Sequence, residues 1–389
     1  MNSFFFPFSR LVKTTGLNAL NTLFQPKNRF LWGVLLLTAH FLIGLYAGFA
    51  DAAASAPITV YGVWHCGNDG CSWSQKPSMS EFDRNNHWLI DRGDGKPSVN
   101  LVVLSFVNPM KLLTNATDTT TLKGIPRGMT PDVIAYFKRR GIRVMLSIGG
   151  IAWVKFWNQA LEVNPSRLGL NAADAALRLG VGMEIDYEED VSPRLSGLQA
   201  FINAYRSKLP YDAAGLQSAA RLTIDLAPGS GWLTAITEKA ATDWLNVSHP
   251  VLDYANAMVP ERQPSSAAAA IAGWREHIDG ISGGAAASLR PIAPCKLTGS
   301  LYITTGMSPS PECAHFEGSL EDTAGLYVRT AAAQGVGITS GMLGFMFWAA
   351  GCPGSQALCT TPPHTCEAGV GEGAARYEIP VPMPALRQR

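Results

Sequence analysis

The chain has 389 residues, of which 47% are hydrophobic, so it can bury a large core as one large domain with extensions or as two small domains. Its 31 basic residues are balanced by 30 acidic residues, and no run of Lys and Arg is longer than Lys138–Arg140. This balance argues against a nucleic-acid partner, because nucleic-acid-binding proteins present a basic face.

We expect residues 1–29 to form a leader, followed by an apolar segment, 30–50, in which His40 is the only side chain that titrates near neutral pH. A short Ala-rich stretch, 51–57, follows as a linker. A signal peptide usually has an apolar region of about 7–15 residues, whereas a membrane-spanning helix needs about 20. The segment therefore fits a cleaved signal peptide or a single transmembrane anchor. In both cases we expect the rest of the chain outside the cytoplasm, either secreted or anchored on the non-cytoplasmic side.

Seven cysteines lie in the rest of the chain, none of them in a CxxC pair or near spaced histidines, so we expect no metal site. Their positions in predicted loops suit disulfide bonds in an oxidising compartment, although their pairing cannot be deduced. An odd number leaves at least one thiol unpaired or paired elsewhere. The cysteines are Cys66, Cys71, Cys295, Cys313, Cys352, Cys359 and Cys366.

From residue 58 onward, short β-rich runs alternate with helical patterns. Several runs are almost continuously apolar, as expected for strands that are buried on both faces. The eight predicted strands are Ile58–Trp64, Asn100–Val107, Ile142–Ile148, Val181–Tyr187, Arg221–Ala227, Val251–Met258, Leu297–Thr304 and Met342–Trp348.

Helical patterns lie between most of these strands. Eight strands and intervening helices in about 300 residues predict an α/β fold of the (β/α)8 TIM-barrel class over residues 58–355. A doubly wound open sheet also alternates in this way, but no GxGxxG turn follows the first strand. After the last strand, residues 356–389 predict an irregular tail that contains Cys and Pro. The predicted helices are Glu81–Ile90, Pro131–Arg140, Pro193–Leu209, Ala267–Ile281 and Leu320–Ala333.

The fourth predicted strand carries three acidic residues at alternate positions, Glu184, Asp186 and Glu188. Because alternate side chains of a strand face opposite sides, these carboxylates would share the inner wall of the barrel, roughly 6.5–7 Å apart. An exposed acidic helix is the alternative, since Glu184 and Glu188 are also four residues apart, but Gly180 and Gly182 are poor helix formers. The residues that would face the surrounding helices are Val181, Met183, Ile185 and Tyr187.

Three carboxylates this close cannot all ionise freely, so they should titrate together, with at least one pKa raised. A raised pKa suits a general acid near neutral pH. Glu188 lies nearest the C-terminal end of the strand, which is where barrel enzymes bind their substrates. We therefore expect Glu188 to meet the substrate, with Asp186 and Glu184 holding it and tuning its acidity.

Two motifs resemble glycoside hydrolase family 18, whose signatures are SxGG on the third strand and DGxDxDxE on the fourth. The first is present as Ser147–Gly150 and the second, with changes, as Val181–Glu188. The resemblance covers residues 58–353. It implies a retaining, substrate-assisted glycosidase of the chitinase type that needs no cofactor.

In this mechanism, Glu188 would protonate the glycosidic oxygen and later activate water as a base. The acetamido carbonyl of the substrate would attack the anomeric carbon to give an oxazolinium ion, which Asp186 would orient and stabilise. The substrate would be a β-1,4-linked N-acetylglucosamine polymer such as chitin. Chitin, N-glycan cores and peptidoglycan-type sugars are not separated by the sequence, and the oligomeric state is open.

The resemblance places Trp348 under the reacting sugar, where an aromatic face suits the apolar face of a pyranose. A core tryptophan is an equal alternative. The short stretch Thr305–Gly318 leaves no room for the insertion that some members carry, which implies an open groove and cleavage within chains. The candidate substrate-binding residues are Trp348, Tyr187, Met258, Ser147, Gly149 and Trp64.

Three positions depart from the family pattern. The middle Asp of the signature is Glu184 and its first Asp is Val181, while Pro260 stands where a Tyr should bond the acetamido carbonyl. Loss of one such bond costs about 10²–10³-fold in rate. The alternative is therefore an impaired or inactive carbohydrate-binding protein on the same barrel. A barrel with different chemistry would need another cluster, for which His65, Asp69 and Asp225 are candidates.

Overall fold

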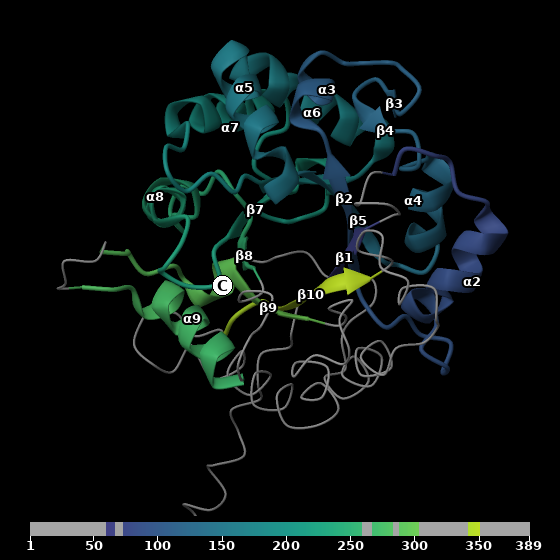
Figure 1. Cartoon of the computed structure of the whole chain (residues 1–389). Helices are drawn as coiled ribbons and strands as arrows, with labels where there is room; N and C mark the ends of the chain where they lie inside the picture. Colours follow the sequence, from purple (N-terminus) through teal and green to yellow (C-terminus); the bar gives the residue numbers. More distant parts are fainter. Residues whose placement is uncertain (1–59, 67–72, 259–266, 283–287, 303–340, 351–389) are drawn as a thin grey trace, which may run out of the picture. The chain divides into compact units, whose positions relative to one another are not determined.

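The apolar segments predicted as strands pair side by side in parallel and close into a barrel (Figure 1). The computed structural model describes residues 60–66, 73–258, 267–282, 288–302 and 341–350. Neighbouring strands of the barrel follow one another in sequence, and the last pairs with the first, which confirms the (β/α)8 class and excludes the open sheet. The strands are β1 (Val60–Cys66), β2 (Leu101–Val107), β5 (Arg143–Gly149), β6 (Gly182–Asp186), β7 (Leu222–Leu226), β8 (Ala255–Ala257), β9 (Leu297–Tyr302) and β10 (Gly344–Ala350).

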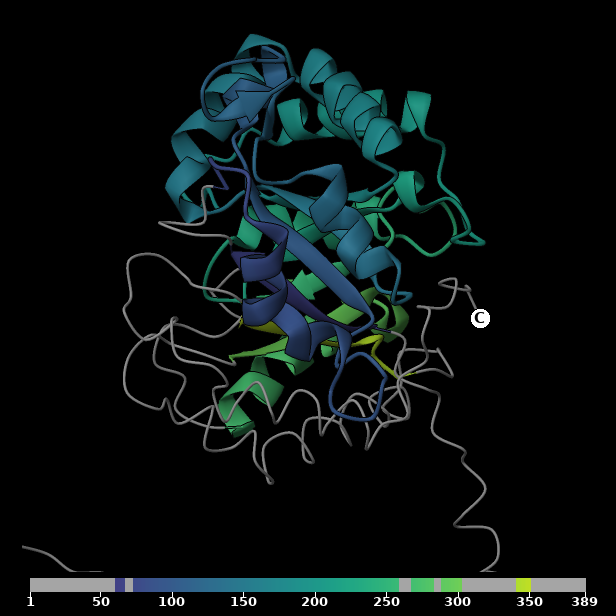
Figure 2. The same cartoon turned by 90° about the vertical axis from the view of Figure 1, so that its right-hand side faces the viewer.

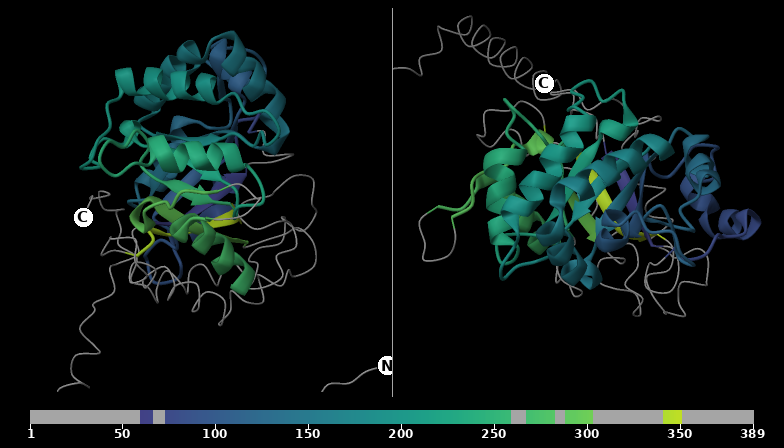
Figure 3. Two further views of the ribbon diagram at one scale, coloured as in Figure 1. Left: turned by 90° about the vertical axis from the view of Figure 1, so that its left-hand side faces the viewer. Right: turned by 90° about the horizontal axis from the view of Figure 1, so that it is seen from above.

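Helices lie outside the strands, as the further views show (Figures 2 and 3). A short antiparallel hairpin, β3 (Thr121–Leu122) and β4 (Ile125–Pro126), interrupts the crossover from β2 to β5. Four short helical turns complete the described elements: η1 (Ile151–Trp153), η2 (Ser218–Ala220), η4 (Pro294–Lys296) and the π-helical η3 (Ala240–Trp244). The α-helices are α2 (Met79–Ile90), α3 (Pro109–Leu113), α4 (Pro131–Lys138), α5 (Val154–Val163), α6 (Pro165–Leu179), α7 (Leu195–Lys208), α8 (Thr234–Lys239) and α9 (Ala267–Asp279).

Helix α6 shows why the chain turns where it does. The Asn164 side chain caps it by accepting the Arg167 N–H at 2.9 Å, and Pro165 occupies the first turn, where no N–H is needed. The helix ends at Gly180 with φ +66°, a left-handed conformation that favours glycine. The chain then enters β6, so these caps determine where the acidic strand begins.

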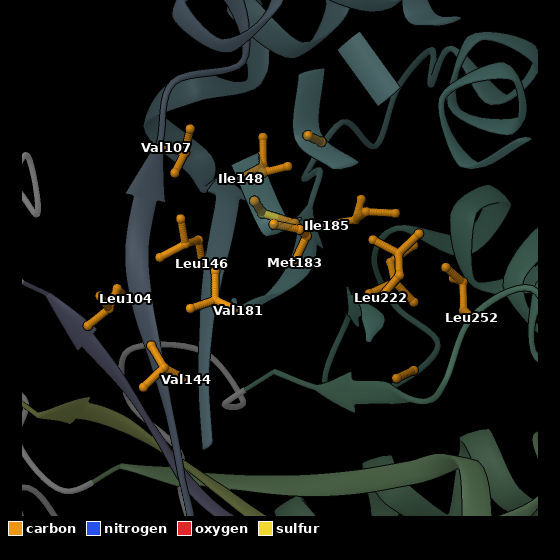
Figure 4. Packing of buried hydrophobic residues seen from close by; sticks show 14 of the residues in the cluster. Leu104, Val107, Val144, Leu146, Ile148, Val181, Met183, Ile185, Leu222 and Leu252 are labelled. Carbon is orange, nitrogen blue, oxygen red and sulfur yellow. The ribbon is translucent and has the colours of Figure 1, made fainter. Parts of the chain in front are cut away.

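The sheet has two apolar faces. The outer core lies between the strands and the helices and includes the outward residues of β2, β5, β6 and β7 (Figure 4). The barrel core is a smaller cluster that fills the lumen below the acidic residues, with Met145, Tyr254 and Met346 among its members. This division matches the expected alternation of β6, because Met183, Ile185 and Tyr187 belong to the outer core.

Strand β8 is shorter than predicted, since only Ala255–Ala257 of the expected Val251–Met258 pairs as a strand. Before this strand the Asp253 carboxylate accepts the Leu222 N–H at 2.7 Å, while the Asp253 N–H donates to the Leu222 carbonyl at 2.9 Å. The same carboxylate lies 2.9 Å from Arg221 and 3.1 Å from Arg206, all largely buried. A buried ion network therefore accompanies the backbone contact in the segment just before β8.

Several predicted features lie outside the described residues: the segments 1–29, 30–50 and 51–57, the helix Leu320–Ala333, and the tail 356–389. The export and anchor assignments therefore stay predictions. None of the helices that the structure describes is long and apolar enough to cross a membrane. Five of the seven cysteines also fall outside, so disulfide formation stays a prediction.

Candidate active site

The inner wall of β6 carries the acidic residues. Glu184 and Asp186 are 1% and 4% exposed inside the barrel, and the half-buried Glu188 follows just past the end of the strand. The segment is therefore extended and faces inward, as the alternation predicts, and it is not an exposed helix. The next acidic residue, Glu189, points elsewhere and accepts the N–H groups of Val191 and Ser192.

Glu184 is held by donors from opposite sides of the lumen. Trp64 of β1 donates Nε1–H to Oε1 at 2.8 Å, and Asn256 of β8 donates Nδ2–H to Oε2 at 2.8 Å. Burial raises the pKa of Glu184, whereas hydrogen bonds from Asp225, Trp64, Ser147 and Thr223 act in the opposite direction. The extra methylene of Glu, compared with the Asp of the family signature, lengthens its reach across the barrel.

A fourth carboxyl group, Asp225 of β7, lies beside the acids of β6. Together, Glu184, Asp186, Glu188 and Asp225 form a carboxyl array. The Asn256 amide also donates to Asp225 Oδ1 at 2.9 Å, so one NH₂ group bridges Asp225 and Glu184. Burial raises the pKa of Asp225 well above its usual value, and the charges of Glu184 and Asp186 raise it further. Thr298 of β9 donates its hydroxyl to Asn256 Oδ1 at 2.7 Å, which fixes the orientation of the amide.

Asp186 and Glu188 form the outer part of the array. Burial raises the pKa of Asp186 well above its usual value, and the charges of Glu188 and Glu184 and a hydrogen bond with Glu188 add to the effect. Burial raises the pKa of Glu188 to about 7, against the opposing hydrogen bonds from Asp186 and from the Ile151 N–H. Two carboxyl groups can share a hydrogen bond only if one holds a proton. The pair is therefore suited to deliver and recover a proton near neutral pH.

The backbone at the ends of β5 and β6 is fixed by Trp157 of α5. Its indole N–H lies 3.0 Å from both the Ile148 and the Asp186 carbonyl oxygens. Gly149, with φ +121°, allows this approach, because a Cβ there would lie 1.9 Å from the Asp186 carbonyl oxygen and 2.2 Å from Trp157 Nε1. The SxGG motif thus positions Asp186, and Gly149 itself is buried.

Of the six predicted substrate-binding residues, Trp348 and Met258 are partly exposed at the C-terminal ends of β10 and β8. The Trp348 ring stacks on Phe106, with centroids 6.0 Å apart and planes inclined by 27°. It also contacts Trp64 at 6.2 Å. An aromatic surface therefore lies at the same end of the barrel as Glu188.

Three other residues predicted to bind substrate are buried in the structure. Tyr187 is fully buried in the outer core, where its ring packs 5.6 Å from Trp157 and its hydroxyl accepts the Arg194 N–H. Ser147 is fully buried beside Glu184 in the register of β5 and β6, and Trp64 is 3% exposed and bonds Glu184. The polar atoms of Tyr187 and Trp64 thus bond protein groups, and a direct contact of these three side chains with substrate stays a prediction.

The two described members of the cluster considered for different chemistry, His65 and Asp225, do not come together. His65 faces away from the lumen, with Nε2 2.6 Å from Asn86 of α2, and stacks on Phe82. Burial lowers the pKa of His65 to about 4, so it is neutral near pH 7. Asp225 faces the lumen, and Asp69 lies outside the described residues. Among those that are described, no three acidic, histidine or cysteine side chains are arranged to hold a metal ion.

Asn256, Thr298 and Trp157 belong to the site but are not predicted from the sequence. The run from Tyr254 to Met258 alternates like β6, and this pattern is a signal that could place Asn256 on the inner wall. The sequence indicates Asp225 only as a candidate for other chemistry, although Thr223 and Asp225 alternate inward in the same way. No signal in the sequence indicates that the Trp157 indole reaches the carbonyl of Asp186.

The raised pKa of Glu188 predicts a measurable effect on stability. Between its ordinary value of 4.5 and about 7, the folded state keeps a proton that the unfolded state has released. The free energy of unfolding should therefore fall as the pH rises through this window, by on the order of 1–3 kcal/mol. Glu188→Gln removes this titration, so the variant should gain stability relative to wild type toward pH 7. Urea unfolding at several pH values measures this, and a difference that is constant from pH 5 to 8 would contradict it.

The structure is similar to several solved chitinases. A GH18 chitinase from Pseudoalteromonas aurantia is 14% identical with a TM-score of 0.48, covering 74% of this chain and 93% of that one. A chitinase from Rhizomucor miehei is 14% identical with a TM-score of 0.46, covering 80% and 99%. A family GH18 chitinase from Cycas revoluta, in complex with allosamidin, is 14% identical with a TM-score of 0.45, covering 81% and 99%.

No protein-family model matches the sequence, and no match was found among curated proteins. The solved structures with similar folds include members of the family that the two motifs resemble. At these values of identity and TM-score, a function has to be assigned from the residues of the site itself.

Proposed function

We propose that this protein is a chitinase-like glycoside hydrolase that cleaves β-1,4-linked N-acetylglucosamine chains with retention of configuration. The observation that carries the proposal is the pair of Asp186 and Glu188 at the C-terminal end of β6. Asp186 is 4% exposed, and its Oδ1 has no hydrogen-bond partner among the described residues. Glu188 lies above it, half-buried, with its pKa raised to about 7.

Glu188 serves as the general acid. A carboxyl group with a pKa of about 7 keeps its proton at neutral pH, and its exposed side can reach the glycosidic oxygen. As the bond from the anomeric carbon to the leaving oxygen breaks, that oxygen takes the proton. Glu188 is left as a carboxylate, and in the second step it accepts a proton from water.

Asp186 serves the substrate's own nucleophile. Its unpartnered Oδ1 can accept the acetamido N–H, which turns the acetamido carbonyl oxygen toward the anomeric carbon. That oxygen forms a bond to the carbon while the leaving group departs, giving an oxazolinium ion whose positive charge lies beside the carboxyl array. Water then attacks the same carbon from the side that the leaving group left, so the configuration is retained.

Trp348 supplies an apolar platform for the reacting sugar. Its ring is backed by Phe106 and Trp64, so the orientation is held by packing on two sides. Aromatic faces of this kind suit the apolar face of a pyranose. Pro260 and Thr305–Gly318 lie outside the described residues, so a slow rate caused by Pro260 and cleavage within chains both stay predictions.

The reaction requires the N-acetyl group, and this requirement gives the test. We expect the protein to cleave N-acetylglucosamine oligomers into products that appear first as β-anomers in proton NMR. Fully deacetylated oligomers of the same length should not be cleaved, because a free amine cannot form the oxazolinium ion. Equal cleavage of both substrates would refute the mechanism. Affinity for the acetylated oligomers without turnover over a wide pH range would instead identify a carbohydrate-binding protein.

A further inference from the structure

Asp225 and Glu184 meet at the centre of the barrel through one shared donor. The Asn256 Nδ2 atom lies 2.8 Å from Glu184 Oε2 and 2.9 Å from Asp225 Oδ1. The Thr298 hydroxyl donates to the Asn256 amide oxygen at 2.7 Å, so the NH₂ group of the same amide faces the two acids. One NH₂ group therefore donates to both carboxyl groups and holds them next to each other.

Among the described residues, no cationic side chain donates a hydrogen bond to either acid. Asp225 and Glu184 are 2% and 1% exposed, and the side chains that donate N–H groups to them, Trp64 and Asn256, are neutral. Two full negative charges at contact distance in a buried site would be strongly unfavourable without a counter-ion. One proton held between the acids removes one charge and adds a hydrogen bond.

We propose that Asp225 and Glu184 form an inner acid pair that holds one proton, and that Asp225 is a positioning residue that keeps part of the negative charge away from Asp186. The consequence for catalysis rests on the proposed function, whereas the proton on the pair does not.

Other ionisable groups face this pair from the packed elements. Asp186 and Glu188 lie above it on β6, and burial raises the pKa of Tyr254, next to β8, which keeps that phenol neutral. Arg221 lies toward the N-terminal end of the barrel, where it bonds Asp253 at 2.9 Å. Arg143 donates to the Gly215 carbonyl at the same end. The remaining inward neighbours, Trp64, Ser147, Thr223 and Met346, carry no charge.

The proton can be detected without any catalytic activity. In an Asp186→Asn, Glu188→Gln background, the outer acids are removed and the inner pair remains. We expect its infrared spectrum at neutral pH to show one buried protonated carboxyl group. Adding Glu184→Gln and Asp225→Asn should remove that group together with one carboxylate. Loss of two carboxylates, or of two protonated carboxyl groups, would overturn the proposal.

The positioning role has a separate readout in the single variant Asp225→Asn. Without its partner acid, Glu184 carries the whole negative charge next to Asp186, which favours the protonated forms of Asp186 and Glu188. Both limbs of the pH profile of kcat/KM for N-acetylglucosamine oligomers should move to higher pH, by about half a unit. A lower rate with an unmoved profile, or a shift to lower pH, would show that Asp225 has only a structural role.

Asp243→Asn provides the matched control, because this acid lies on the exterior in an ion pair with Lys239 one helical turn away. It should move neither limb of the profile and leave the infrared band in place. If the wild-type protein proves inactive, the infrared experiment still decides whether the pair holds a proton. If the band is absent and hydrolysis occurs, the inner pair is refuted while the proposed function stands.

Discussion

Replacing Glu188 by Gln should lower the rate of hydrolysis of N-acetylglucosamine oligomers by about 10²–10⁴-fold, the range that a general acid–base group contributes. Gln has nearly the same shape but no proton to donate at neutral pH, so the leaving oxygen would depart unprotonated. Because Gln fits the same half-buried position, the substitution should leave the neighbouring Asp186 and Ile151 N–H in place. Release of reducing ends measures the rate, and calorimetry of oligomer binding should show affinity near that of wild type.

Glu189→Gln is the matched control for this variant. The Glu189 carboxylate is next in sequence but is bonded to Asn158 at 2.6 Å and to two loop N–H groups. The same substitution there should leave kcat close to wild type. Equal hydrolysis by wild type and Glu188→Gln would exclude Glu188 as the general acid, and an equal loss in both variants would indicate a disturbed loop.

Replacing Gly149 by Ala should lower the free energy of unfolding by about 2–6 kcal/mol, which combines the cost of a positive φ with that of overpacking. The new Cβ would meet the Asp186 carbonyl and the Trp157 indole at distances that no relaxed structure permits. Both groups would have to move, and hydrolysis should fall as well. Urea unfolding measures the stability, and the rate on the same sample measures the displacement of Asp186.

Substitutions at two other glycines separate the cost of a positive φ from the cost of overpacking. Gly95 has φ +79° but no atom within 4 Å of the place that a methyl group would take, so Gly95→Ala should cost only the backbone contribution of about 1–2 kcal/mol. Gly231 also has nothing within 4 Å and no positive φ, so Gly231→Ala should change stability by less than about 0.5 kcal/mol. A Gly149→Ala variant no less stable than Gly95→Ala would contradict the close approach seen at the end of β5.

The strands of the barrel can be predicted because their burial leaves a direct record in the sequence. Residues 183–188 alternate between apolar and acidic side chains, and only an extended strand separates them onto two faces. Helix α6 leaves no such record, because its buried positions are mostly Ala and Gly. A Cβ on Gly169 would lie 2.3 Å from the Phe201 carbonyl oxygen, so large apolar residues would not fit there.

The part of the site on β6 can be predicted from one segment, whereas the rest depends on register between strands. Asp225 pairs with Asn256 across β7 and β8, and Asn256 pairs with Thr298 across β8 and β9. These three residues lie 31 and 42 positions apart, so no local spacing links them. The contact of the Trp64 indole with Glu184 across the lumen has no local signal for the same reason.

The two sides of β6 depend on different neighbours, and this has a consequence for redesign. The side chains of Met183 and Ile185 hold the strand against the helices, while the carboxyl groups of Glu184 and Asp186 face the lumen. The acidity of the inner wall can therefore be altered through Asp225, Asn256 or Thr298, on other strands, without a change in the residues that attach β6 to its helices. A library confined to those three positions would vary the working pH while keeping the scaffold unchanged.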